Sequence, residues 1–275
     1  MATMQKRLIF EGAVLLLACA GIFAALASWD LTPTDITADL SRDLESKLGD
    51  RMIVELRRQG RTIRTEPLDR AVDTTLSRLT AARATTRFGY TCEVLEAPQI
   101  NALMLPGGRI VVFRGLLDVI EQPEELAAVL AHEIGHAEKQ HVAKRLFRQF
   151  GLVVLGGAAG GDGVLITEIT KGLVASVFDR AQEEEADRFG RDLLLSAKLD
   201  PRVMATALRH MKQGVQKLPR ALQLLSTHPD IDDRIRESLS HRVPSGAKFT
   251  PLGIDWPAVQ KSLPERPAAD PDAND

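Results

Sequence analysis

The sequence predicts an α+β fold that is mainly helical and contains a small β-sheet. Short runs of β-forming residues occur at 88–95 and 109–114, each beside turn signals. Helical patterns cover much of the remaining chain, and one of them is an apolar-periodic run at 124–145. With 44% hydrophobic residues, the roughly 245 residues behind the N-terminal segment can bury the core of one folded domain.

The first 29 residues are expected to be an export signal or a membrane anchor. Two basic residues precede an apolar stretch, 8–27, which only Glu11 interrupts, and the small residues 25–28 suit cleavage. The uninterrupted part is 16 residues long, which is short for a span of about 20 residues and long for a signal core. The segment is therefore either removed or retained in the inner membrane with its basic end inside, and lipidation at Cys19 ranks third.

Two helices are expected before the sheet. Residues 34–60 have charged faces at helical spacing, and 66–87 carries a second helical pattern. We therefore assign 30–64 to an N-terminal helical segment.

In the predicted strand 88–95, Cys92 lies on an alternating face and has no partner cysteine outside the signal region. We expect it to be a buried, small apolar residue.

Residues 132–136 read His-Glu-Ile-Gly-His inside the run 124–145. A proline and two glutamates open this run, as is typical of a first helical turn. Because a helix turns about 100° per residue, His132 and His136 share one face and can bind one metal ion. Zinc with two histidines, a third protein ligand and an open position lowers the pKa of bound water to about 7. Glu133 can then act as general base and general acid, so we expect one Zn²⁺ per chain.

The third ligand decides the class of metal site. The metzincin pattern places a third histidine six residues after the second, but residue 142 is valine, so that class is excluded. His141 lies nine residues from His132, which on one continuous helix is the opposite face. We expect His141 to be a surface or packing residue. The remaining option is an acidic ligand on a separate helix.

The stretch 179–190 offers such a helix. Glu183 and Asp187 are four residues apart and share a face. One of them can bind the metal while the other accepts a hydrogen bond from a ligand imidazole and fixes its tautomer. The adjacent Glu184 and Glu185 are expected on a solvated face.

These motifs resemble the HtpX-type and Oma-type zinc metalloproteases, in which H-E-x-x-H is followed by E-x-x-x-D. Other blocks match the family's order and spacing: Asn101-Ala102, Pro106–Val112, Gly115–Leu117, Glu125–His136 and Arg180, although Asp179 stands where the family often has serine. The likeness covers roughly residues 65 to 240. It implies a zincin-like metalloprotease domain, which we place at 65–262, with Glu183 as the third zinc ligand and Asp187 supporting the site.

The resemblance also implies how a polypeptide substrate is held. Proteases of this layout commonly add an extended peptide to the exposed edge of a small sheet. We therefore expect Asn101, Ala102, Pro106, Gly107 and Gly108 to bind substrate. An ordinary hairpin without a substrate role is the alternative.

A Thr-His-Pro block at 227–229 is followed by a charged stretch that contains Arg234, as is frequent in the resembling family. His228 is a catalytic candidate, because it can stabilise the oxyanion or occupy the open metal position in a resting state. The alternative is a structural or exposed histidine in a turn before proline.

The rest of the chain is expected to be helical. Residues 150–177 are apolar and glycine-rich, but charged residues interrupt them, which favours two core helices joined at 160–163 over a membrane span. Residues 201–239 continue the helical pattern. The tail 263–275 is rich in Pro, Ala and Asp and is expected to be disordered.

The net charge of −2 gives no reason to expect nucleic acid as a partner. The motifs and the resemblance imply a zinc-dependent endopeptidase of the cell envelope, expected in the periplasm, that degrades misfolded or misassembled envelope or outer-membrane proteins. Two alternatives stay open. The pocket can serve a chaperone with latent proteolysis, or the chain can be a membrane-anchored adaptor with structural zinc.

Overall fold

The computed structural model describes residues 42–265, except 152, 153, 155, 157–159, 161, 162, 176, 218–227 and 229. The chain divides into two units, 1–40 and 41–275, and all described residues belong to the second. The expected signal or anchor at 1–29 therefore lies outside the described residues. Among those residues, no helix combines the length and the apolar character that crossing a membrane requires.

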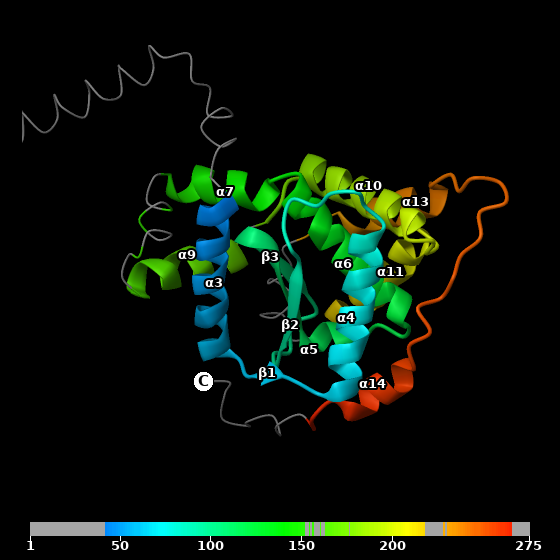
Figure 1. The fold of residues 1–275 in the computed structure, drawn as a ribbon, viewed down its shortest axis with the longest axis horizontal. Helices are drawn as coiled ribbons and strands as arrows, with labels where there is room; N and C mark the ends of the chain where they lie inside the picture. The colour runs from blue at the N-terminus through cyan, green and yellow to red at the C-terminus, as the bar shows by residue number, and fades with distance from the viewer. Residues whose placement is uncertain are drawn as a thin grey trace, which may run out of the picture. The chain divides into compact units, whose positions relative to one another are not determined.

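The described unit is mainly helical with one small sheet, which confirms the predicted α+β class (Figure 1). Its helices are α3 (Arg42–Gln59), α4 (Glu66–Ala81), α5 (Arg114–Leu117), α6 (Pro123–Glu138), α7 (His141–Phe150), α9 (Gly163–Ala175), α10 (Arg180–Ser196), α11 (Val203–Gln216), α13 (Ile231–Ser240) and α14 (Trp256–Ser262). Its strands are β1 (Thr62–Ile63), β2 (Thr91–Leu95), β3 (Ala102–Leu105) and β4 (Arg109–Phe113).

The sheet has the strand order β1-β2-β4-β3. The two predicted strands are present as β2 and β4, which run parallel with Thr91 opposite Arg109. The sequence patterns did not indicate β3, which pairs antiparallel with β4 and forms the edge of the sheet. All four residues of β3 are buried, so the strand lacks the alternation that identifies a half-buried strand.

The turn Pro106–Gly108 joins β3 to β4 and packs against α3. Gly107 and Gly108 have φ values of 72° and 77°, a left-handed conformation that costs glycine little. A Cβ on Gly107 would lie 2.4 Å from Ser46 Cα. The Pro-Gly-Gly sequence is thus explained by the backbone conformation and by close packing on α3.

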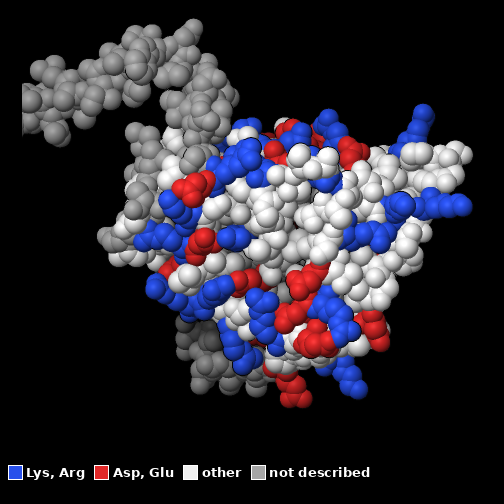
Figure 2. Space-filling model, viewed as in Figure 1, with Lys and Arg blue, Asp and Glu red and all other residues white. Residues whose placement is uncertain are grey.

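The helices α3 and α4 flank β2 on the face shown in Figure 1. Acidic and basic side chains are interspersed on this face (Figure 2). Two ion pairs tie α3 to strands of the sheet: Arg57 Nε lies 2.8 Å from Glu93 Oε2, and Arg109 Nε lies 2.8 Å from Asp50 Oδ1. Cys92, expected to be buried, is half-buried, because it lines a cavity whose other residues include Arg64 and Asp73.

Three expectations need correction. The helix expected at 66–87 ends at Ala81. The run 124–145 is not one helix, because α6 ends at Glu138, and Gln140 adopts a left-handed φ of 59° before α7 begins. The disorder expected from 263 does not hold for the first two residues of that tail, since Leu263 is buried and the Pro264 carbonyl accepts a hydrogen bond from Arg114 Nη1 at 2.9 Å. Residues 266–275 lie outside the described residues.

Helix α6 runs through the centre of the unit. It contacts α4, α10, α11 and β3, and every residue from Glu125 to Ala137 is buried. A helix that is apolar nearly all round belongs inside a core. The position of α6 therefore buries the His-Glu-Ile-Gly-His motif among packed neighbours.

The helices α6 and α10 pack with their backbones in close contact. A Cβ on Gly135 of α6 would lie 2.8 Å from the Ala186 carbonyl oxygen of α10. A Cβ on Gly190 of α10 would lie 3.2 Å from the backbone nitrogen of His132. The absence of side chains at these two glycines allows α10 to approach the motif on α6.

We predict that Gly135→Val lowers the free energy of unfolding by about 1–3 kcal/mol, the usual cost of overpacking a tight contact. Urea denaturation monitored by circular dichroism measures this change. Gly89→Val is the matched control, because a Cβ at Gly89 meets no atom within 4 Å. Equal stability of the two variants would show that the close helix contact is not a constraint.

Candidate active site

Three donor atoms converge from two helices. The Nε2 atoms of His132 and His136 lie 3.0 Å apart. The Glu183 carboxylate of α10 lies 3.6 Å from the first of these atoms through Oε2 and 3.3 Å from the second through Oε1. All three side chains are buried. The structure thus brings together the three residues expected to bind metal.

The spacing of these donors fits a zinc ion. Zinc binds imidazole nitrogen and carboxylate oxygen at about 2.0–2.2 Å in tetrahedral geometry, which separates neighbouring donors by roughly 3.3 Å. The observed separations of 3.0, 3.3 and 3.6 Å agree with that value. Burial holds the pKa of the His136 imidazole well below its ordinary value, so this side chain is neutral, as a metal ligand must be.

Asp187 orients the first histidine. Its Oδ1 lies 2.7 Å from His132 Nδ1, one turn of α10 beyond Glu183. With Nδ1 engaged as a donor to the carboxylate, His132 presents the lone pair of Nε2 to the other two donors. The structure therefore brings Asp187 to the imidazole that it is expected to orient.

Arg234 of α13 holds both acidic residues. Its Nε and Nη2 atoms bind Asp187 Oδ2 and Oδ1 at 2.7 and 2.8 Å, and its Nη1 lies 2.7 Å from Glu183 Oε2. Burial alone would raise the pKa of Glu183, but the neighbouring His228 and Arg234 outweigh burial and hold that pKa well below its usual range. Glu183 is therefore ionised, as a metal ligand requires.

His228 approaches the same donors from the segment before α13. Its Nδ1 lies 2.8 Å from Glu183 Oε1 and 3.3 Å from His132 Nε2. The four ligand atoms of His132, His136, Glu183 and His228 all lie within 4.8 Å of one another. His228 is buried beside the donors and is therefore not an exposed turn residue. Most of its flanking block, 218–227 and 229, lies outside the described residues.

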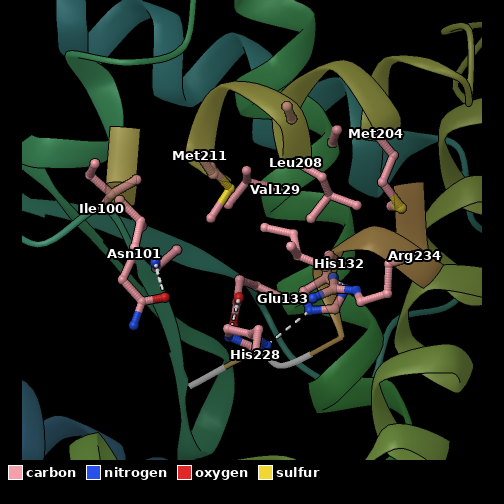
Figure 3. A pocket seen from close by; sticks show the side chains of 15 residues that line it. Ile100, Asn101, Val129, His132, Glu133, Met204, Leu208, Met211, His228 and Arg234 are labelled. Carbon is pink, nitrogen blue, oxygen red and sulfur yellow. Dashed lines mark hydrogen bonds and ion pairs between the residues drawn. The ribbon is translucent and has the colours of Figure 1, made fainter. Parts of the chain in front are cut away.

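Glu133 faces the pocket beside the donors (Figure 3). The carboxylate is 2% exposed, and its Oε1 lies 3.5 Å from His228 Nε2. Its Oε2 is buried and has no hydrogen-bond partner within the described part of the chain. A buried acceptor in this state is suited to take a proton from a small molecule that enters the pocket.

The pocket has a polar end and an apolar wall (Figure 3). The polar end is formed by His132, Glu133, His228 and Arg234, and the wall by Ile100, Ala128, Val129, Met204, Ala207, Leu208, Met211, Val215 and Ile231. Asn101 and Ala102 also line the pocket, at the start of edge strand β3. The structure does not bring Pro106, Gly107 or Gly108 to this lining, because their turn is buried against α3.

His141 is not a surface residue, whereas the packing role that was the other part of the expectation is compatible with its burial. Because the chain turns at Gln140, His141 begins α7 and is only 2% exposed. Its Nδ1 lies 3.0 Å from His136 Nδ1, and its Nε2 lies 3.2 Å from Glu185 Oε2. Glu185 is consequently only partly solvated, whereas Glu184 is exposed as expected.

Comparison with known protein families identifies the family of this chain. The sequence model of peptidase family M48 matches residues 64–242. The chain belongs to peptidase family M48. The match includes the two helices that carry the converging donors, α6 and α10, together with His228 and Arg234.

Named relatives are metalloendopeptidases and beta-barrel assembly-enhancing proteases. The mitochondrial metalloendopeptidase OMA1 of Schizosaccharomyces pombe is 31% identical over 72% of this chain and 58% of its own length. The beta-barrel assembly-enhancing protease of Yersinia pestis is 29% identical over 86% of this chain and 52% of its own length. The chain thus spans about half the length of the curated relatives it matches.

We predict that Glu183→Ala weakens zinc binding far more than Glu184→Ala, because only Glu183 points at the two imidazoles. Asp187→Ala should fall between them, with a loss of about 10–100-fold that is typical of residues supporting a metal ligand. Competition with a chromophoric chelator measures the zinc affinity of each variant. Equal losses at positions 183 and 184 would reassign the third ligand.

Proposed function

We propose that this chain is a zinc-dependent endopeptidase of the cell envelope that degrades misfolded or misassembled envelope proteins, including outer-membrane proteins. One observation carries the proposal. The donors of His132, His136 and Glu183 have the mutual spacing of zinc ligands, and the partnerless oxygen of Glu133 lies beside them. This is the arrangement that metal-assisted hydrolysis of a peptide bond requires.

Each residue of the site would have a separate role in hydrolysis. A zinc ion bound by the three ligands would supply a Lewis acid for the scissile carbonyl and make water a stronger acid. Glu133 Oε2 would accept the proton of the attacking water and deliver it to the leaving amine nitrogen. Arg234 and Asp187 would keep Glu183 and His132 oriented throughout, because both carboxylates are already fixed by buried hydrogen bonds.

The pocket supports a polypeptide substrate. Edge strand β3 begins at Ala102, and both Asn101 and Ala102 line the pocket, so an extended peptide beside this edge would run past Glu133. The apolar wall contributed largely by α11 would receive an aliphatic or aromatic side chain. Unfolded and misassembled proteins expose such side chains. The Pro106–Gly108 turn does not line this pocket, so it is not among the residues that would bind substrate.

The cellular location rests on the N-terminal sequence and on the relatives. The basic residues and apolar stretch before residue 29 support export to the periplasm or anchoring in the inner membrane. The names of the relatives from Yersinia pestis and Escherichia coli refer to β-barrel assembly. Together they favour substrates in a bacterial envelope.

A chaperone or adaptor with latent proteolysis is the second candidate. The position of His228 among the donors favours it, since this side chain is placed to compete with water for the metal. Aggregation assays with an unfolded outer-membrane protein separate the two functions. A chaperone would suppress aggregation equally well before and after Glu133→Gln, and the wild-type protein would cleave nothing.

We predict that Glu133→Gln retains about one zinc per chain but cleaves casein at least roughly a hundredfold more slowly, because it removes the base and leaves all three ligands. Metal analysis and the protease assay are made on the same sample, with and without a chelator. Wild-type cleavage rates in this variant would refute the assigned mechanism.

We predict that His228→Ala raises the cleavage rate of the zinc-loaded protein. The reason is that the Nδ1 of His228, 2.8 Å from Glu183 Oε1, lies among the ligands and its removal opens a position for water. His241→Ala, in the segment after α13, is the control. A decrease of about 10²–10³-fold in the cleavage rate would instead indicate that His228 stabilises the oxyanion formed during hydrolysis.

A further inference from the structure

A line of polar contacts extends from His136 away from the pocket. His136 Nδ1 lies 3.0 Å from His141 Nδ1, and His141 Nε2 lies 3.2 Å from Glu185 Oε2. The other oxygen of Glu185 lies 2.9 Å from Lys139 Nζ. These residues come from three places: the end of α6, the start of α7 and the middle of α10.

Only one arrangement of protons satisfies this line when His136 binds a metal. A ligating Nε2 must use its lone pair, so the neutral His136 ring carries its proton on Nδ1 and donates it to His141 Nδ1. His141 must then carry its own proton on Nε2, which donates to Glu185 Oε2. Glu185 accepts a second hydrogen bond from the Lys139 ammonium group. Every donor in the line thus has an acceptor.

We propose that His141 and Glu185 are positioning residues that fix the tautomer and the ring orientation of His136 for metal binding. This inference rests on the zinc site proposed above. It gives each ligand histidine its own partner: Asp187 holds Nδ1 of His132 at 2.7 Å, and His141 holds Nδ1 of His136 at 3.0 Å. Such partners commonly change metal affinity about 10–100-fold.

The burial of His141 argues against a role in packing alone. An imidazole that is 2% exposed has two polar nitrogens, and burying polar atoms is unfavourable unless each is hydrogen-bonded. An apolar residue would fill the same space without that requirement. The backbone also adopts a left-handed conformation at Gln140, which is uncommon for a residue other than glycine, and this turn places His141 beside His136.

Two substitutions at position 141 separate positioning from packing. His141→Asn retains a side-chain carbonyl that can accept the proton of His136 Nδ1, whereas His141→Phe retains a ring but has no acceptor. We expect His141→Phe to weaken zinc binding about 10–100-fold and His141→Asn to recover most of that affinity. The melting temperature of each metal-free variant reports packing, and nitrogen-15 NMR of the zinc-loaded protein reports the tautomer of His136.

A second pair keeps the proposal testable if His141→Phe does not fold. Glu185→Ala, at the partly exposed end of the line, should weaken zinc binding by a smaller factor, and its exposed neighbour Glu184→Ala should not. Wild-type affinity in both His141→Phe and Glu185→Ala, or equal losses in His141→Phe and His141→Asn, would overturn the proposal. Failure of the wild-type protein to bind zinc would instead overturn the proposed function.

Discussion

The close contact between α6 and α10 is the constraint on which the site depends. A helix of this kind can supply two histidines by itself, but the third donor must come from elsewhere in the chain. Gly135 and Gly190 leave room for the two backbones to meet, with the buried Ala186 packed against Gly135. This contact brings the Glu183 carboxylate to 3.3 Å from His136 Nε2, and the orienting contact from Asp187 follows from the same packing.

The buried charges around the site hold one another in place. Arg234 binds Glu183 and Asp187 together, with three contacts of 2.7–2.8 Å, and His228 adds a contact of 2.8 Å to Glu183. A buried carboxylate without such a partner would become protonated and could not bind metal. The Arg234 guanidinium, together with His228 at Glu183, therefore keeps two acids ionised inside a core that would otherwise disfavour their charge. The ligands are fixed before any metal binds, which limits the reorganisation that binding requires.

The sequence predicted those parts of the site that depend on local spacing. Four-residue separations on helices identified His132 with His136 and Glu183 with Asp187, because helical geometry alone sets which side chains share a face. It did not predict β3, whose residues are all buried and do not alternate, or the break at Gln140, where no glycine or proline marks a turn. The contacts of Arg234 and His141 depend on tertiary packing across α13, α10 and α7, which spacing along the chain does not report.

Anomalous diffraction at the zinc absorption edge, from crystals of the zinc-loaded protein, shows directly which side chains bind the metal. We predict one strong peak per chain, about 2.0–2.2 Å from His132 Nε2, His136 Nε2 and a Glu183 carboxylate oxygen. We also expect the Nδ1 atoms of His132 and His136 to donate hydrogen bonds to Asp187 and His141, respectively. A zinc peak bound by other side chains, with the three predicted ligands left uncoordinated, would contradict this prediction.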